Sequence, residues 1–120
     1  MTPFGLKLRS LRKNKNISIT ELSKILKVST PYLSMLENGK RGKPPNGMVE
    51  LICAYFGLIW DDAEDLKRLA SVSHPKPSID VRGQSANAVH LSNLLAQNIK
   101  RLSPEDCGDL IREIERRIQI

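Results

Sequence analysis

Residues 18–40 read SITELSKILKVSTPYLSMLENGK. The stretch opens with Ser18, and Glu21 follows three residues later, which is the spacing of a capping box. Apolar residues then recur at the spacing of one helical face, at Leu22, Ile25 and Leu26. The pattern predicts a short helix over residues 19–26 with an apolar inner stripe.

A second short helix is predicted over residues 30–37. Ser29 stands at its N-cap position, and Pro31 lies in the first turn, where the missing N–H removes no helical hydrogen bond. The pair Asn38-Gly39 is a signal that ends a helix. Because only residues 27–29 separate the two helices, the stretch fits the physical description of a helix-turn-helix.

Three further helices are predicted around this pair, over residues 3–14, from Asn46 or Gly47 to Gly57, and from Asp61 to about residue 72. The first begins with a proline after a Thr cap, and the second is the apolar run MVELICAYF, which fills most of a helix circumference. The third has acids at its start and cations toward its end, in agreement with the helix dipole. Leu58 and Trp60 are expected to fill the gap between the last two helices. Together the five helices predict one small bundle, a domain over residues 1–72.

The composition changes after this bundle. From residue 73 the sequence SHPKPSIDVRGQS contains two prolines, a glycine and small polar residues, which predicts a linker over residues 73–84. Two more helices are predicted within residues 85–120, the second with Ser103 as its cap and Pro104 at its first position. The expected fold class is therefore all-α, a five-helix bundle followed by a C-terminal helical hairpin.

Each of the two C-terminal helices carries one apolar stripe. The helices could bury part of these stripes on each other, but a lone two-helix hairpin has too little core to be stable. Pairing with a second copy would complete a four-helix core around a two-fold axis, so residues 85–120 are predicted to be the dimerisation region. The predicted interface residues are Leu91, Leu94, Leu95, Asn98, Ile99, Leu102, Leu110, Ile111, Ile114 and Ile118.

Positive charge is concentrated in the first part of the chain. Residues 1–45 carry ten Lys and Arg against two Glu, a net charge of +8, whereas the remaining residues carry a net charge of −2. Such segregation favours a nucleic acid or an anionic membrane as the partner. A membrane-surface role needs a basic amphipathic helix with aromatic anchors, and the cations here lie at helix ends and in loops instead. A nucleic acid is therefore the favoured partner.

Other classes of function lack their signatures. No apolar run reaches the ~20 residues of a membrane span, and the start MTPFGLKLRS lacks the apolar core of a signal peptide, so we expect a cytoplasmic protein that does not bind membranes. Cys53 and Cys107 have no thiol or His nearby to complete a metal site, and His74 and His90 have no partner at a fixed spacing. With no nucleophile–base pair and no phosphate loop, we expect no catalytic residue, no metal, no cofactor and no enzymatic activity.

Residue by residue, the opening stretch resembles the helix-turn-helix of the Cro and phage-repressor (XRE) family. The matching features are Leu22 with the small Ser23, Val28 in the turn, Leu33 and Leu36 in the second helix, and the ending with Glu37 and Gly39. The resemblance covers about residues 4–58, or reaches residue 72 when all five helices are counted. It implies a repressor-like fold that binds double-stranded DNA.

Two positions depart from the family pattern. Residue 19 is usually a Gln that contacts the DNA backbone; here it is Ile19, so a contact must come from its peptide N–H at the helix N-terminus. The turn position that is usually Gly holds Lys27, a poor occupant of a left-handed conformation. Either strain of about 1 kcal/mol is tolerated there or the turn differs.

The resemblance also implies an ion pair between Glu37 and Arg12 of the first helix. Such a pair would hold helix 30–37 against helix 3–14 without touching DNA. The alternative is a Glu at a helix end that reaches toward Lys40 in solvent, an exposed pair of the kind that contributes little stability.

Helix 30–37 is the candidate reading helix. If Leu33 and Leu36 point inward, the opposite face presents Thr30, Pro31, Ser34 and Met35 as the candidate base contacts. These side chains can pack on a thymine methyl group or make single hydrogen bonds, but none can make a bidentate pair with a base. Direct base readout is therefore expected to be modest, with DNA shape supplying part of the specificity.

The positions around the reading helix supply the candidate phosphate contacts. Cations directly after the helix are placed to meet the phosphate strand beside the major groove, where they add affinity without sequence information. Helix caps and helix N-termini add further donors. The predicted phosphate contacts are Ser18, Ile19, Lys27, Ser29, Tyr32, Asn38, Lys40, Arg41 and Lys43.

Two functions follow from this reading of the sequence. The first is a transcriptional regulator that binds an inverted-repeat operator as a homodimer. The alternative is an antitoxin, as some XRE-like proteins are, whose residues 85–120 bind a small toxin protein. A toxin gene beside this gene, or co-purification with a small partner, would distinguish the second function from the first.

Overall fold

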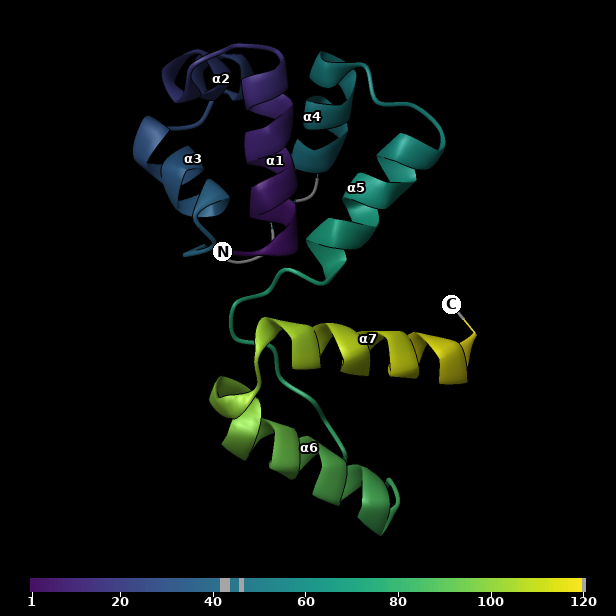
Figure 1. Cartoon of the computed structure of the whole chain (residues 1–120). Coiled ribbons are helices and arrows are strands. Elements are labelled where there is room, and N and C mark those ends of the chain that lie inside the picture. The colour runs from purple at the N-terminus through teal and green to yellow at the C-terminus, as the bar shows by residue number, and fades with distance from the viewer. Residues whose placement is uncertain (42–43, 46, 120) are drawn as a thin grey trace. The chain divides into compact units, whose positions relative to one another are not determined.

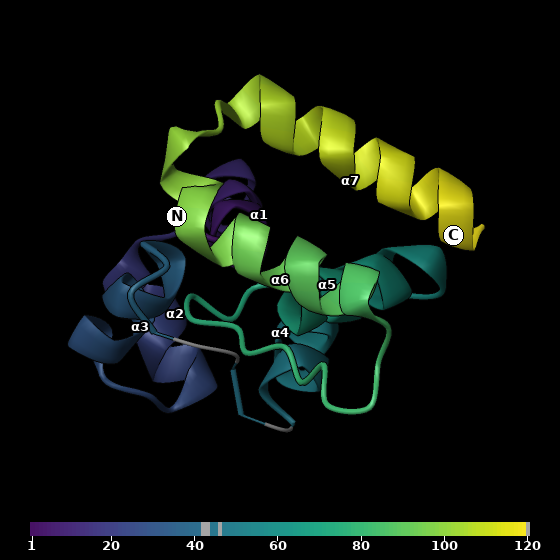
Figure 2. The same cartoon turned by 90° about the horizontal axis from the view of Figure 1, so that it is seen from below.

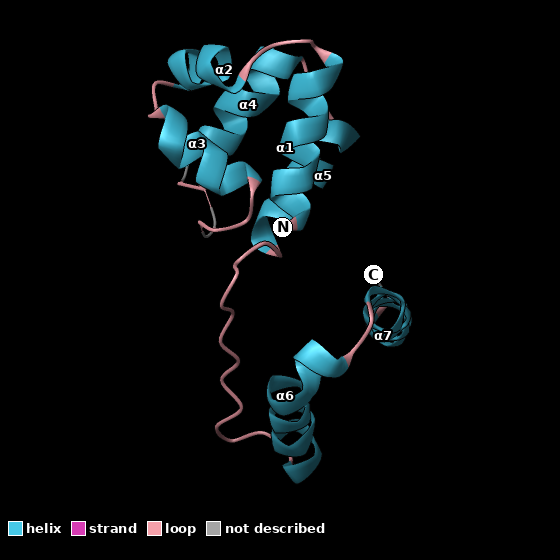
Figure 3. Ribbon diagram, turned by 60° about the vertical axis from the view of Figure 1, so that its left-hand side comes forward, coloured by secondary structure: helices cyan, strands magenta, loops and turns pink. Residues whose placement is uncertain are grey.

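The computed structural model describes residues 1–41, 44–45 and 47–119. Over these residues the secondary structure consists of α-helices and one 3-10 turn, without strands, which confirms the predicted all-α class (Figures 1 and 3). The chain divides into two compact units, Met1–Pro77 and Ser78–Ile120. Within the described ranges, no helix combines the length and the apolar composition that crossing a bilayer requires.

The first unit is a bundle of five helices. They are α1 (Pro3–Asn14), α2 (Ile19–Leu26), α3 (Thr30–Glu37), α4 (Met48–Phe56) and α5 (Asp61–Ser71). Helix α1 packs against α3 and α5, α2 packs against α3 and α4, and α4 packs against α5 (Figure 1). The predicted boundaries are confirmed: α1, α2 and α3 each begin at a side-chain cap, and α4 lies between Gly47 and Gly57. Helix α5 begins at Asp61 as predicted, without a side-chain capping hydrogen bond.

All five helices contribute to one apolar core. Its buried members are Phe4, Leu8, Leu22, Leu26, Leu33, Leu36, Met48, Val49, Ile52, Cys53, Leu66 and Ala70. Leu58 packs against this cluster as expected, but the prediction for Trp60 is wrong, since 82% of this residue is exposed. Trp60 occupies the N-cap position of α5 with a positive φ of 52°, and its indole ring lies in solvent rather than between α4 and α5.

A glycine sets how closely α1 approaches α3. A Cβ atom on Gly5 would lie 2.5 Å from the carbonyl oxygen of Glu37 and 2.8 Å from that of Leu36. Backbone atoms cannot yield to such a contact as a flexible side chain can, so only glycine fits here without a shift of the helices. The end of α3 is therefore held directly against the first turn of α1.

Ser73 connects the end of the bundle to its beginning. It is buried, its hydroxyl oxygen accepts a hydrogen bond from the Phe4 N–H at 2.9 Å, and its hydroxyl donates to the Leu69 carbonyl. Ser73, predicted to be the first linker residue, thus packs within the first unit.

The second unit contains α6 (Ala86–Asn98), a 3-10 turn (Ile99–Arg101) and α7 (Pro104–Ile118). The two helices extend to the same side of the turn (Figure 2), but their axes spread apart away from it (Figure 1). No described residue in either helix is buried. Leu94 is 50% exposed on α6, and Ile111 is 57% exposed on α7. The hairpin therefore leaves most of its apolar stripe exposed, with only Leu95 and Leu102 half-buried.

Candidate nucleic-acid interface

The caps of α2 and α3 leave hydroxyl hydrogens available at the surface. The Ser18 Oγ accepts from the Glu21 N–H at 3.0 Å, and the Ser18 N–H donates to Glu21 Oε1 at 3.5 Å, so the predicted capping box is present. The Ser29 Oγ accepts from the Tyr32 N–H at 3.1 Å. Both serines are exposed, and within the described residues neither hydroxyl donates to a protein atom. Each hydroxyl can therefore donate to a phosphate oxygen.

Ile19 lies at the first position of α2 with its side chain partly buried against the core. Its peptide N–H belongs to the first turn, where backbone donors have no partner inside the helix. Only the backbone N–H of residue 19 is therefore available to a phosphate. This agrees with the expectation for Ile19, which stands where the family usually has Gln.

The turn between α2 and α3 has a left-handed residue at Lys27, with φ 58° and ψ 43°. The Lys27 N–H donates to the Lys24 carbonyl and the Val28 N–H donates to the Ser23 carbonyl at 3.0 Å, the pattern that closes a helix C-terminus. The sequence left open whether Lys27 tolerates strain or the turn adopts another conformation. The structure keeps the left-handed turn, so the strain at Lys27 is tolerated. The Lys27 side chain is exposed.

Lys27→Gly is expected to raise the free energy of unfolding by about 0.5 to 1 kcal/mol, because glycine adopts a left-handed conformation without steric cost. The same change should weaken binding to every duplex and lower the salt dependence by about one phosphate contact. Lys27→Ala is the matched control, since it removes the charge and keeps the strain. Urea unfolding and duplex titration measure both effects, and a glycine variant no more stable than the alanine variant would contradict the strain.

Helix α3 buries one side and presents the other. Leu33 and Leu36 are buried in the core. The candidate base contacts are exposed or half-buried, and they are Thr30, Pro31, Ser34 and Met35. Tyr32 packs partly on the core, and the guanidinium carbon of Arg41 lies 5.8 Å from the centre of its ring. The structure thus brings the four candidate base contacts together on one helix, with an aromatic–cation pair at its flank.

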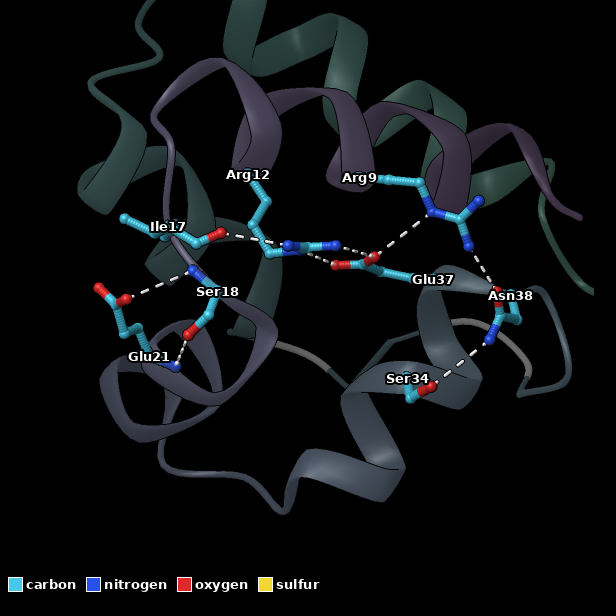
Figure 4. A network of polar contacts seen from close by, with 8 residues as sticks. All are labelled: Arg9, Arg12, Ile17, Ser18, Glu21, Ser34, Glu37 and Asn38. Atoms are coloured by element: carbon cyan, nitrogen blue, oxygen red, sulfur yellow. Dashed lines mark hydrogen bonds and ion pairs between the residues drawn. The ribbon is translucent and has the colours of Figure 1, made fainter.

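Beneath this face, Glu37 is buried and paired (Figure 4). Its carboxylate accepts from Arg12 Nε at 2.8 Å and from Arg12 Nη2 at 3.2 Å, while Arg12 Nη1 donates to the Ile17 carbonyl at 3.1 Å. The hydrogen bond to Glu37 raises the pKa of the Arg12 guanidinium. The carboxylate therefore points toward α1 and not toward Lys40, and the pair joins α1, α3 and the segment before α2.

Arg9 extends this network to the outer face of α3, a role that was not predicted from the sequence. Its Nε lies 3.6 Å from Glu37 Oε1, and its Nη2 donates to Asn38 Oδ1. Asn38 Nδ2 in turn donates to Ser34 Oγ at 3.4 Å (Figure 4). One signal was available in the sequence, because Arg9 precedes Arg12 by three residues and both therefore lie on one side of α1.

The basic segment starts where α3 ends. The Gly39 N–H donates to the Leu36 carbonyl and the Lys40 N–H donates to the Met35 carbonyl at 2.9 Å, so a Schellman motif terminates the helix. Lys40 and Arg41 follow it and are exposed. Lys43, also predicted to contact phosphate, lies outside the described residues.

The charge of the chain follows the division into units. Residues 1–77 contain thirteen Lys and Arg against seven Asp and Glu, whereas residues 78–120 contain six of each. The positive potential that would attract a polyanion therefore belongs to the first unit alone.

The described residues contain no cluster of three or more His, Cys, Asp or Glu that could hold a metal ion. Cys53 and Cys107 are both free thiols. Cys53 is buried in the core, and this burial raises the pKa of its thiol, so it behaves as a small apolar residue.

The predicted dimer residues lie on α6, the 3-10 turn and α7. A groove in the second unit is lined by Leu91, Leu94, Leu95, Asn98, Arg101, Leu102 and Leu110. Ile114 and Ile118 continue the exposed apolar stripe along α7. These side chains form an apolar surface that the second unit does not cover by itself.

Residues 8–59 match the helix-turn-helix family. Two proteins of Bacillus subtilis (strain 168) are similar to this chain. An uncharacterized HTH-type transcriptional regulator, RghRB, is 24% identical over 121 residues, which cover 92% of this chain and 87% of that protein. The HTH-type transcriptional repressor RghR is 41% identical over 65 residues, which cover 50% of this chain and about half (48%) of that protein. No solved structure matches this chain with significance.

Proposed function

Because residues 8–59 of this chain belong to the XRE-type helix-turn-helix family, we propose that the protein is a sequence-specific transcriptional regulator that binds an inverted-repeat DNA operator as a homodimer. The observation that carries the proposal is the capped α2–α3 pair, whose outer face is followed at once by exposed cations. Both similar proteins are named as HTH-type regulators, which supports the same role here. The protein would act in the cytoplasm by binding and not by catalysis.

In this proposal α3 enters the major groove and its outer face meets the base edges. The base contacts are Thr30, Pro31, Ser34 and Met35. The surrounding donors and cations hold the phosphate strands and set the register without reading sequence. These phosphate contacts are Ser18, the Ile19 N–H, Lys27, Ser29, Tyr32, Asn38, Lys40, Arg41 and Lys43.

Mutations should distinguish the base contacts, which set sequence preference, from the phosphate contacts, which set overall affinity. Met35→Ala is expected to reduce the preference among operator variants by about 1 kcal/mol or more, because it removes an apolar contact in the groove. Arg41→Ala should weaken all duplexes alike, because it removes a phosphate contact. Titration of both variants against a panel of single-base operator variants measures this. If Arg41→Ala changes the preference and Met35→Ala does not, the orientation of α3 is wrong.

The second unit supports self-association. Most of its apolar stripe is exposed, and on α7 all three arginines pair with acids of the same helix, as Asp109–Arg112, Glu113–Arg116 and Glu113–Arg117. Residues 78–120 carry no net charge, so two copies of the second unit would approach without net long-range repulsion. A two-fold axis through joined stripes would present two copies of α3 to half-sites about 34 Å apart, one turn of DNA.

Deleting residues 85–120 is expected to give a folded monomer that binds the operator at least about 100-fold more weakly, because the second half-site no longer adds its affinity. In the full chain, Leu94→Glu and Ile114→Glu should have the same effect, since they place charge on the stripe. Gln97→Glu, on the exposed surface of α6 outside the stripe, is the matched control.

Mass in solution and operator affinity decide the result. A truncated protein that stays dimeric with unchanged affinity would refute the dimerisation role. A full chain that is monomeric alone but binds a small co-purifying protein through residues 85–120 would favour the antitoxin function instead.

A further inference from the structure

We infer that hydrogen bonds inside the protein fix the polarity of base readout, so that Thr30 accepts a hydrogen bond from a base and Ser34 donates one. This inference rests on the proposed function, since it names the chemistry by which the outer face of α3 would select bases. It is carried by two hydrogen-bond chains, one beneath each side chain.

The first hydrogen-bond chain runs from α2 to Thr30. The Ser23 hydroxyl donates to the Thr20 carbonyl at 2.7 Å, which uses its only hydrogen. The Ser23 Oγ also lies 3.0 Å from Thr30 Oγ1, so in this contact Ser23 accepts and Thr30 donates. The hydrogen of Thr30 is thereby directed into the protein, and Ser23, 3% exposed, is held in place by the packing of α2. Only the lone pairs of Thr30 are left for a partner outside.

The second hydrogen-bond chain runs from α1 to Ser34. An Arg side chain can only donate, so the bond from Arg9 fixes the Asn38 amide with its oxygen toward α1. The amide nitrogen must then face Ser34, where it donates to the hydroxyl oxygen at 3.4 Å. Within the described residues no acceptor takes the Ser34 hydrogen. Arg9 is therefore a positioning residue that keeps Ser34 available as a donor through the Asn38 amide (Figure 4).

The two polarities select different base edges in the major groove. An acceptor-only Thr30 fits the amino groups of adenine N6 or cytosine N4 and is mismatched with guanine and thymine, whose corresponding groups are acceptors. A donating Ser34 fits the acceptors guanine O6, thymine O4 or a purine N7. The preferred operator should thus carry an amino-bearing base opposite Thr30 and an acceptor opposite Ser34, in each half-site.

The test uses the full-length protein and base analogues that lack one group. Preferred operators are first selected from random duplexes. Each adenine or cytosine is then replaced by purine or 2-pyrimidinone, which lack the amino group. Acceptors are removed in the same way: 7-deaza analogues of guanine and adenine lack N7, 2-aminopurine lacks the O6 of guanine, and 5-methyl-2-pyrimidinone lacks the O4 of thymine. Each lost contact should weaken wild-type binding about fivefold, the effect of one hydrogen bond.

Variants assign each effect to its residue. Thr30→Val should abolish the sensitivity to one amino-group deletion, and Thr30→Ser should keep it. Ser34→Ala should abolish the sensitivity to one acceptor deletion and leave the sensitivity to amino-group deletions unchanged. Arg9→Ala should lower this same sensitivity, because the Asn38 amide can then turn and accept from Ser34, and Arg9→Lys should restore part of it. A purely structural role for Arg9 would instead weaken binding to all duplexes equally.

Three outcomes would overturn the inference. If no amino-group deletion weakens wild-type binding, the polarity assigned to Thr30 is wrong, and this result needs no variant to fold. If Thr30→Val loses sensitivity to an acceptor deletion instead, the direction of the Ser23–Thr30 bond is reversed. In both cases the DNA-binding function stands. If the wild-type protein selects no sequence, the proposed function and this inference fail together.

Discussion

Arg12→Ala is expected to lower the free energy of unfolding by about 3 kcal/mol, because it leaves the Glu37 carboxylate inside the bundle without its main partner. Glu37 is 2% exposed and takes two hydrogen bonds from Arg12. The variant also loses the bond from Arg12 to the Ile17 carbonyl, which fastens the segment before α2. Urea or thermal unfolding of the full chain measures the change.

Arg9→Ala is the matched control for this prediction. Arg9 also approaches Glu37, but at 3.6 Å and with 33% of its side chain exposed, so its loss should lower stability by about 1 kcal/mol or less. Combining Arg12→Ala with Glu37→Gln should recover part of the loss, because the unpaired carboxylate is then absent. An Arg12→Ala variant as stable as Arg9→Ala would show that the pair does not hold α3 against α1.

The same pair has a consequence for DNA binding. Gly5 and the Arg12–Glu37 pair both act at the end of α3, one by allowing close backbone approach and the other by a buried ion pair. Together they fix α3 relative to α1 while its outer face stays exposed. A reading helix needs this combination, because its base contacts lose specificity if the helix shifts within the groove.

Helix boundaries could be predicted from the sequence because their signals are local. Ser18, Ser29 and Ser103 each cap the helix that follows, and each accepts from a backbone N–H within three residues. Such contacts form within a single turn and need no other part of the chain. The apolar stripes of the first unit were equally readable, since helical spacing identifies the buried face.

Contacts between distant residues could not be predicted in the same way. Arg9 and Asn38 lie 29 positions apart, and their bond exists only once α1 and α3 have packed. Trp60 was predicted to fill the gap between α4 and α5, but it lies at the N-cap of α5 with a positive φ and is 82% exposed. The Arg12–Glu37 pair came from the family resemblance rather than from the spacing of charges in this chain.

The claim that this protein is a DNA-binding regulator is tested most directly by measuring duplex binding as a function of salt concentration. In a homodimer, about six to ten cations would lie near phosphates, so the association constant for a selected operator should fall by about 10³- to 10⁵-fold between about 50 and 200 mM salt. Arg41→Ala should make this dependence shallower by about one phosphate contact per protomer, and Gln97→Glu should leave it unchanged. A steep, linear decrease on logarithmic axes is the predicted result. An association constant that stays the same across this range would contradict the assignment of this protein as a DNA-binding regulator.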